Sequence, residues 1–364
     1  MNTSLPSKPE RPLPFTPSDI PADKLVIRAV AAHAVAAARG PSVSPGEISR
    51  QFWPRDAATH ALIERAATAP ATTVTAGWAA ELAARATGAF IGSLLDSAAA
   101  ALIGASPRFA MNGIYTLALP RPSSTTGGAA WIGEGSPIVI PQAALVAPLL
   151  GPVKKLAIAE VITRELSEAS PEDVEGIVEI ILKNSITRTL DLTLFDSLPA
   201  TAVRPAGLTN GLTPVTAATG GGHNAALGDV RSLVDAAVLG GGSGAVMFFT
   251  SSGRATTLLG YAPALAGRVF GSASIASTTL IAVDPRAFAS ALGDAVEIRA
   301  SKETLLHMED TTPLQIGTAG SPPTVAAPAR AMFQTDSIAI RVIMRMAWAM
   351  RVPAVSFITT GLTW

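Results

Sequence analysis

The alternation of apolar and polar residues is most regular near the end of the chain. From residue 338 to residue 352 every second position is apolar, and Arg341, Arg345 and Arg351 stand between them on the other face. A period of two predicts a β-strand, and a strand of this length would reach about 50 Å at roughly 3.3 Å per residue. The apolar positions are Ile338, Ile340, Val342, Met344, Met346, Trp348, Met350 and Val352.

A long helix is predicted over residues 171–195. Ser170 supplies a capping side chain, Pro171 suits the first turn, and two acidic residues follow at the positive end of the helix dipole. An apolar face then recurs with helical spacing, and it consists of Val174, Ile177, Val178, Ile181, Leu182, Ile186 and Leu190. The helix would be about 36 Å long. A helix and a strand of this size predict an elongated subunit.

Shorter elements are predicted around these two. The first 21 residues contain six prolines and are expected to form a tail. The patterns predict helices at 23–39, 45–67 and 78–104, a linker at 68–75 and a strand at 155–164. They also predict a compact α/β unit at 206–300, with helices at 229–239, 254–259 and 285–292 and strands at 245–250, at 278–283 and from 295.

Residues 136–152 combine features that rarely occur together. Prolines at 137, 141, 148 and 152 exclude a continuous helix, yet the segment is too apolar for an ordinary solvated loop. One interpretation is a buried pair of strands. The other is an arm whose apolar side chains pack on a neighbouring subunit. The predicted intersubunit contacts are Val139, Ile140, Leu145, Val146, Leu149 and Leu150.

Composition favours an oligomer and narrows the classes of function. Only 15% of the residues are charged and 48% are hydrophobic, so much of the surface should be covered by partners. The formal net charge of zero argues against a dedicated nucleic-acid-binding protein. The chain has no cysteine, no recognisable signal peptide at its start, and an apolar stretch at 88–105 that is too short to span a membrane. These features predict a protein of the reducing cytoplasm.

We predict no catalytic, cofactor-binding or metal site. None of His33, His60, His223 and His307 has a second ligand at metal-binding spacing. The glycines at 240–244 follow a predicted helix and precede a strand, which is the reverse of a dinucleotide-binding loop. They are better explained as a helix end with a tight turn.

Several blocks, in this order, resemble the Hong Kong 97-type major capsid fold of tailed phages. Together the blocks span residues 68–364 almost continuously. They are TAPATTVTAGWAAELA (68–83), SPRFAMNGIYTLALPR (106–121), AAWIGEGSPI (129–138), GPVKKLAIAEVITRELSEASPEDVEGIVEIIL (151–182), LTNGLTP (208–214), LIAVDPRAF (280–288), ASKETLLHMEDTTP (300–313) and FQTDSIAIRVIMRMAWAMRVPAVSFI (333–358).

The resemblance implies an α+β fold with the parts of that family. It implies an N-terminal arm with a first peripheral strand at 68–125 and an extended loop at 126–155. A peripheral domain, with a long spine helix and long β-strands, would take 156–205 and 300–352. An axial α/β domain would take 206–299 and 353–364. Residues 1–67 lie outside the resemblance, and we expect a helical extension there that acts as a scaffold and is separable from the fold of the remainder.

The resemblance also implies a function and partners. The chain would be a non-enzymatic major capsid protein of a bacteriophage or prophage. It would self-assemble through pentamers and hexamers into an icosahedral shell around double-stranded DNA, which it would contact non-specifically at the inner surface. Portal, scaffold, protease and decoration proteins would be further partners. The protein would be located in the virion after assembly in the host cytoplasm. An encapsulin-like nanocompartment shell is the alternative, and an α/β enzyme built on 206–300 is a third reading. In some relatives a lysine of the extended loop forms a covalent bond between subunits. Residues 136–153 contain no lysine, so we expect the contacts between subunits to be non-covalent.

Overall fold

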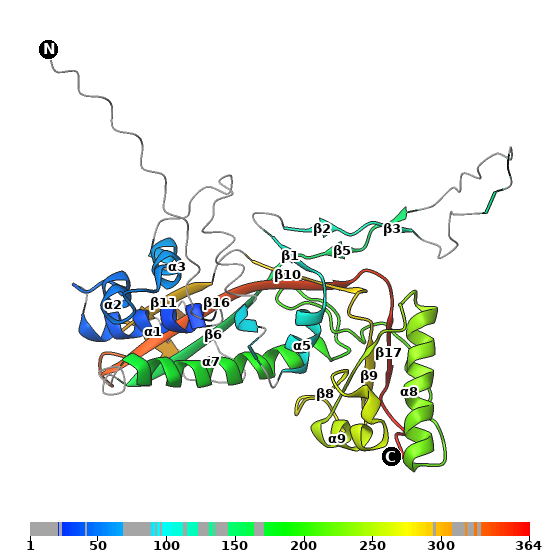
Figure 1. Ribbon diagram of the computed structural model, residues 1–364. Coiled ribbons are helices and arrows are strands. Elements are labelled where there is room, and N and C mark those ends of the chain that lie inside the picture. Colours follow the sequence, from blue (N-terminus) through cyan, green and yellow to red (C-terminus); the bar gives the residue numbers. More distant parts are fainter. Residues whose placement is uncertain are drawn as a thin grey trace.

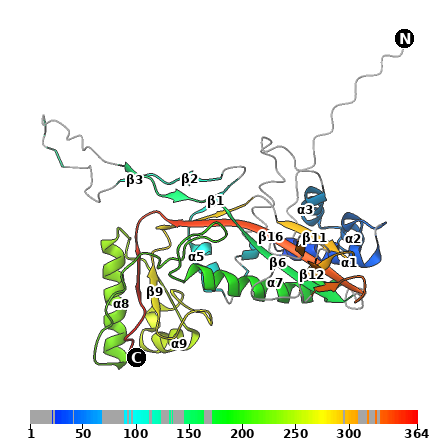
Figure 2. The same cartoon turned by 180° about the vertical axis from the view of Figure 1, so that it is seen from behind.

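A long β-sheet and a long helix lie together along the subunit, a compact lobe hangs from one end, and a thin arm leaves the sheet (Figures 1 and 2). The computed structural model describes residues 21, 24–40, 42–67, 89–91, 93–94, 97–111, 115–122, 131–132, 134, 145–163, 171–293, 296–307, 317–318, 324–325 and 329–364. The predicted proline-rich tail at 1–20, most of the linker and the first half of the predicted helix at 78–104 lie outside these residues.

The strand β16 (Ser337–Met350) is the common partner of the larger sheet. One edge pairs antiparallel with β6 (Lys154–Thr163). The other edge is shared end to end by β11 (Glu297–Ser301) and β10 (Phe288–Leu292), and β1 (Arg108–Ala110) adds in parallel to β10. The predicted long strand is therefore confirmed. Its 14 residues span about 46 Å at 3.3 Å each.

The long helix α7 (Pro171–Leu194) packs on one face of this sheet. Its most buried side chains recur every four residues, at Val174, Val178, Leu182, Ile186, Leu190 and Leu194. Because an α-helix has 3.6 residues per turn, a spacing of four drifts by about 40° per step. The buried stripe therefore winds around the helix, so that α7 meets one group of neighbours at its beginning and another at its end.

The opposite face of the sheet has its own small core. Alternate residues of β10 point to different clusters: Phe288 and Leu292 join the main core, whereas Ala289 and Ala291 join a core with Leu150. The prediction of a helix at 285–292 is therefore wrong. Its alanines suit a helix locally, but both faces of the segment are buried between neighbouring strands, which selects a short apolar strand.

The compact lobe holds a separate four-stranded sheet. Its order is β17-β9-β7-β8, with α8 and α9 packed against it around Phe248, Leu258 and Leu280. The elements are α8 (Gly222–Leu239), β7 (Met247–Thr250), α9 (Ser252–Tyr261), the 3-10 helix η1 (Pro263–Leu265), β8 (Val269–Gly271), β9 (Leu280–Val283) and β17 (Val355–Ile358). The helices predicted at 229–239 and 254–259 are confirmed and are longer than expected. The strand predicted from residue 295 is β11, which belongs to the larger sheet.

The glycines after α8 end the helix and form a turn, as predicted. Gly240 is its C-cap, and Gly241 and Gly244 adopt φ angles of 92° and 80°, which side chains disfavour. A Cβ on Gly240 would lie 2.0 Å from the carbonyl oxygen of Pro353. The turn therefore requires glycine both for its conformation and for this close approach.

Residues 24–67 form three helices, which we call the N-terminal helical unit. They are α1 (Lys24–Arg39), α2 (Pro45–Phe52) and α3 (Ala57–Ala67). The single helix predicted at 45–67 is broken at Trp53–Asp56, where the Asp56 carboxylate caps α3 by accepting a hydrogen bond from the Thr59 amide at 2.9 Å.

Downstream, α5 (Ala98–Ala105) begins at its own N-cap, Ser97, so the predicted helix at 78–104 is also interrupted. Four short strands form two antiparallel pairs, β12 (Leu305–His307) with β15 (Ala329–Ala331) and β13 (Gly317–Thr318) with β14 (Thr324–Val325).

The helix α1 is part of the main core. Eleven of its sixteen residues are buried, and it packs against α7, β11 and β16. A helix that is apolar all round is a core helix. Its end is also fixed, because the Lys302 ammonium donates to the carbonyl oxygen of Ala38.

Charged groups tie α1 to its neighbours. The Arg28 guanidinium lies 3.1 Å from the Asp56 carboxylate and 3.3 Å from that of Glu175 on α7, and it stacks over the Trp53 ring at 5.5 Å. Lys24 adds a contact of 3.6 Å to Glu175. Removing one member of such a buried group leaves the others uncompensated.

The expectation that residues 1–67 are separable from the fold is therefore wrong for 24–67. The alanine-rich faces of α1 are compatible with contacts between subunits as well as with a core, and the sequence does not distinguish these. In the structure they cover α7 and the sheet of the same chain, so deletion would expose the main core.

We predict that Ile27→Ala lowers the free energy of unfolding by about 2–5 kcal/mol, because this fully buried α1 side chain would leave a cavity. Denaturant unfolding of the dilute subunit, followed by circular dichroism, measures the loss. Arg55→Ala, on the exposed turn before α3, is the control and should change stability by no more than about 0.5 kcal/mol. Equal, small changes in both variants would contradict a core role for α1.

We predict a loss of stability below pH 6.5 that originates at His33. Burial, with a smaller contribution from the Arg299 charge, lowers the pKa of this α1 histidine from 6.5 to about 4, and its Nε2 atom has no hydrogen-bond partner. The unfolded chain takes up a proton near pH 6.5 but the folded chain does not do so until about pH 4. Stability therefore falls across this window by up to about 3 kcal/mol.

Unfolding curves of the wild type and of His33→Leu, recorded from pH 7.5 to pH 4, test this origin. Carboxylates titrate in both proteins, so the difference between the two profiles isolates the histidine. The variant should lose less stability on acidification than the wild type. Parallel profiles would show that His33 does not contribute.

Candidate assembly surfaces

The arm is a narrow antiparallel ribbon that leaves the body (Figures 1 and 2). Its outgoing side contains β2 (Leu117–Ala118) and β3 (Arg121–Pro122), and its returning side contains β4 (Leu145–Val146) and β5 (Leu149–Leu150). β2 pairs with β5 and β3 pairs with β4. This pairing fixes which side chains face the body and which face outward.

The six predicted contact residues divide between these faces. Leu149 and Val146 are 60% and 43% exposed, which leaves apolar side chains without cover in the isolated subunit. Leu150 is fully buried with Leu119 and Met111 of the same chain, so its packing partners are not on a neighbour. Successive strand residues point to opposite faces, which separates Leu149 from Leu150. Val139, Ile140 and the side chain of Leu145 lie outside the described residues.

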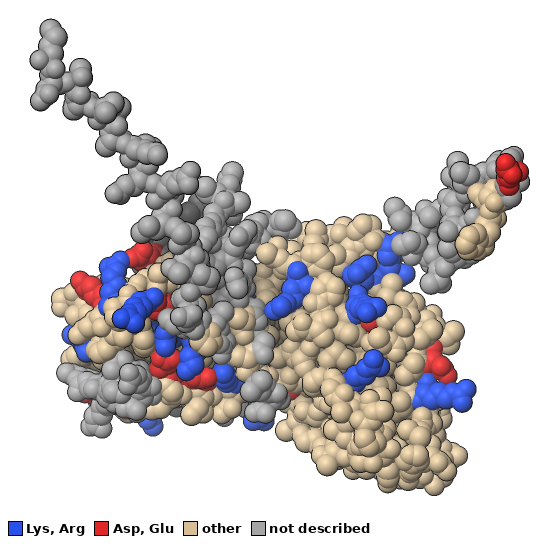
Figure 3. All heavy atoms as spheres, viewed as in Figure 1, with Lys and Arg blue, Asp and Glu red and all other residues tan. Residues whose placement is uncertain are grey.

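The far part of the arm presents Trp131, Ile132 and Glu134, which we call the arm tip. Trp131 is fully exposed and Ile132 is 40% exposed, and Figure 3 shows an acidic side chain at the end of the arm, away from the body. Exposure of a tryptophan ring to water is unfavourable in free energy. Tryptophan is also one of the residue types that contribute most to the binding energy of interfaces. The tip is therefore a second candidate contact.

Further exposed apolar side chains, which the sequence analysis missed, lie on the body. On α8, Leu227, Val238 and Leu239 are exposed, while Leu233 and Ala237 form the buried stripe. Apolar residues off the buried stripe are the signal that could have identified this surface. Others are Tyr115, Ile180, Leu192, Leu198, Val203 and Phe333. Each is a surface that a neighbour could cover.

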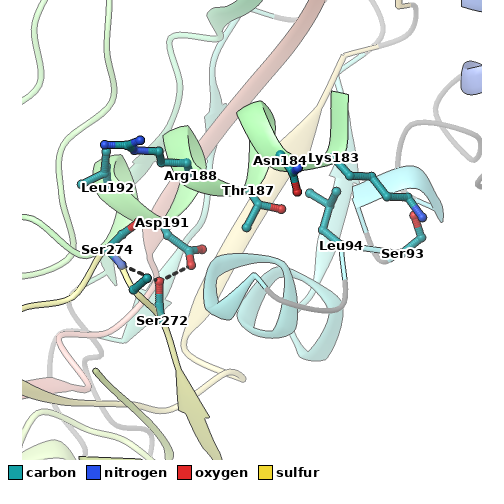
Figure 4. A pocket seen from close by; sticks show the side chains of 11 residues that line it. Ser93, Leu94, Lys183, Asn184, Thr187, Arg188, Asp191, Leu192, Ser272 and Ser274 are labelled. Carbon is teal, nitrogen blue, oxygen red and sulfur yellow. Dashed lines mark hydrogen bonds between the residues drawn. The ribbon is translucent and has the colours of Figure 1, made fainter. Parts of the chain in front are cut away.

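A hollow of about 630 Å³ lies between Ser93 and Leu94, α7 and residues 272–274 (Figure 4). Asp191 lies at its floor with both carboxylate oxygens engaged. Oδ1 accepts from Ser97 Oγ at 2.7 Å and from Ala99 N at 2.9 Å, and Oδ2 accepts from Ser272 Oγ at 2.5 Å. This carboxylate caps the start of α5 and joins it to α7 and the lobe, which is a structural role.

The carboxylates of the compact lobe have similar roles. Burial acts to raise the pKa of Asp284, but hydrogen bonds from the Ser243 amide and hydroxyl and the Arg286 amide outweigh it and lower the pKa. Asp229 accepts from Ala218 N at 2.6 Å and Trp364 Nε1 at 2.7 Å. Both side chains hold turns or the chain end.

In the part of the chain that the structure describes, no three His, Asp or Glu side chains are grouped so that they could bind a metal ion. None of the helices in that part is long and apolar enough to cross a membrane.

No protein-family model matches the chain. A capsid polyprotein of Pseudomonas phage PAJU2 is 28% identical over 331 residues, which cover 85% of this chain and 49% of that protein. The chain thus spans about half the length of the curated relative it matches.

Among solved structures, a chain from Microbacterium phage Oxtober96 superposes with a TM-score of 0.50 and 16% identity, over 73% of this chain and 91% of that one. A chain from Mycobacterium phage Bobi gives a TM-score of 0.49 and 17% identity, over 72% and 90%. The fold is α+β and of the Hong Kong 97 type found in phage capsids, as the sequence predicted.

We predict that Leu149→Asp leaves the subunit folded but prevents its assembly. The side chain is exposed in the monomer, so the new charge costs several kcal/mol only when a neighbour covers it. Circular dichroism should match that of the wild type, and electron microscopy should show no particles.

The adjacent position supplies a matched control. Leu150→Asp buries the same charge in the subunit's own core and should abolish folding itself. Normal particles from Leu149→Asp would show that this part of the arm is not an interface.

Proposed function

We propose that this chain is the major capsid subunit of a tailed bacteriophage or prophage. Copies associate into pentamers and hexamers, and these build an icosahedral head around double-stranded DNA. The fold and the printed name of the relative from Pseudomonas phage PAJU2 support the proposal. The observation that carries it is the arm, a ribbon with uncovered apolar side chains attached to an otherwise well-packed, elongated body.

The energetics of such an arm favour assembly. Each apolar side chain that a neighbour covers contributes about 25 cal/mol per Å² of buried surface, before the entropy cost of association. In one subunit Leu149 and Trp131 remain in water. A closed shell provides the same cover at every copy, because each subunit gives one arm and receives one.

The body has the stiffness that a shell plate needs. β16 pairs along both of its edges, and α7 covers the main core along the same direction. We assign this sheet and α7 to the periphery of each ring. We assign the compact lobe to the ring centre, and it comprises residues 206–284 and 353–364 rather than 206–299, because β10 and β11 belong to the larger sheet.

The proposed role is structural rather than enzymatic. Three buried or partly buried carboxylates accept hydrogen bonds that hold helix caps and turns, namely those of Asp191, Asp229 and Asp284. The packaged DNA would be contacted without sequence specificity at the inner surface. Portal, scaffold, protease and decoration proteins are the partners that a head requires, and the mature protein would reside in the virion after assembly in the host cytoplasm.

Expression of the chain should yield rings or closed shells, because the isolated subunit leaves apolar surface uncovered. Sedimentation velocity at moderate salt measures the distribution, and electron microscopy shows the particle form. A stable monomer at high concentration would overturn the proposal. Particles that enclose a protein cargo instead of nucleic acid would indicate an encapsulin-like compartment.

A further inference from the structure

The arm tip has an unusual composition. Between Pro122 and Val153 the chain contains a single charged residue, Glu134. It follows closely on the exposed Trp131 and Ile132. A lone carboxylate beside a tryptophan, on an arm without other charges, forms a compact recognition element for a surface that offers a cation and an aromatic contact.

The N-terminal helical unit presents such a surface. Residues 24–67 contain six basic and three acidic residues, a net charge of +3. The three acids are engaged within the subunit: Glu64 pairs with Arg50, Glu47 accepts from the Ser44 amide, and Asp56 is held by Arg28. Lys24 and Arg28 also pair with Glu175 of α7, so the positive charges without a carboxylate partner among the described residues of this unit include Arg39 and Arg55.

Arg55 is the cation best placed to receive a carboxylate. It stands on the exposed turn between α2 and α3, directly after Pro54, and no carboxylate among the described residues lies within ion-pair distance of it. The unit already uses guanidinium–aromatic contacts, with Arg28 over Trp53 at 5.5 Å and Arg39 over Phe52 at 5.1 Å. An indole from another chain would meet the same chemistry at Arg55.

The placement of these parts makes the contact one between copies. The arm points away from one end of the elongated subunit and the N-terminal helical unit lies at the opposite end (Figures 1 and 2). Because α1 is buried in the main core, the unit is a fixed part of each copy. The other exposed cations near a hollow are less suitable, since Lys183 already pairs with Glu179 at 2.7 Å and Arg188 lines the hollow that has the Asp191 carboxylate at its floor.

We propose that the arm tip of one copy docks on the N-terminal helical unit of a neighbouring copy, with Glu134 paired to Arg55 and Trp131 packed beside it. The inference rests on the proposed shell function and names the receptor of the arm. It gives the N-terminal helical unit a role in assembly in addition to its role in the core.

A pair of introduced cysteines tests the contact directly, because the natural chain has none. Particles of Ile132→Cys/Ala57→Cys, with Ala57 exposed two residues after Arg55, should give a ladder of multimers with a short bis-maleimide. Each single variant should give at most dimers. Ile132→Cys/Asn184→Cys, which directs the reagent to the α7 hollow, is the matched control and should give no ladder.

Charge reversal tests the pairing. Glu134→Lys and Arg55→Glu should each cause loss of particles while circular dichroism is unchanged, and the double variant should restore them. Glu134→Lys with Lys183→Glu should stay defective. Intact particles without a 132–57 ladder, a ladder with residue 184 instead, or a double variant as defective as the singles would overturn the docking while leaving the shell function in place. Absence of particles from the wild-type chain would instead overturn the shell function.

Discussion

Pairing along β16 is the interaction on which the other parts of the subunit depend. β6 pairs along one edge from Ser337 to Met346, and the other edge is divided between β11 and β10, so this strand connects segments from residues 154–163 and 288–301. Its apolar face supports α1 and α7, and its other face, with β10, supports the base of the arm. A polar substitution at Ile340 or Met344 would therefore disturb the main core that the sheet shares with α1 and α7.

The subunit combines a densely packed body with uncovered apolar side chains, and the proposed shell function explains why both occur together. In the body even the helix α1 is largely buried. The arm and the outer side of α8 keep apolar side chains in water. A monomer gains nothing from the second feature. An assembly gains from both, since a rigid body holds each adhesive surface at a fixed distance and angle from the next.

The parts that sequence predicts well are those in which one period persists over many residues. The alternation from Ile338 to Met350 and the apolar face of α7 needed no knowledge of the neighbours. Short or alanine-rich segments are decided by their partners instead. Residues 288–292 have acceptable helix formers, and only β1 and β16 on either side make them a strand. The apolar residues of α1 likewise fit a subunit interface or a core, and only α7 and β11 decide between them.

The candidate contacts show the same limit. The prolines and aliphatic residues of 136–152 indicate a segment unlike ordinary loops, but they do not state which side of a ribbon each residue takes. Pairing of β5 with β2 sends Leu150 inward and Leu149 outward. The sequence also does not identify Arg55 as the proposed partner of Glu134. That choice depends on which basic residues already pair with the acidic residues of the same helical unit.

The burial of α1 has a consequence for synthesis on the ribosome. This helix is made well before its partners on β11 and β16, and the bond from Lys302 to Ala38 joins residues 264 positions apart. Contacts of such long sequence separation form late in folding. A nascent chain therefore cannot complete its main core before β16 has left the ribosome. Until then the apolar side chains of α1 lack the partners that cover them in the folded chain, and exposed apolar surface of this kind promotes aggregation.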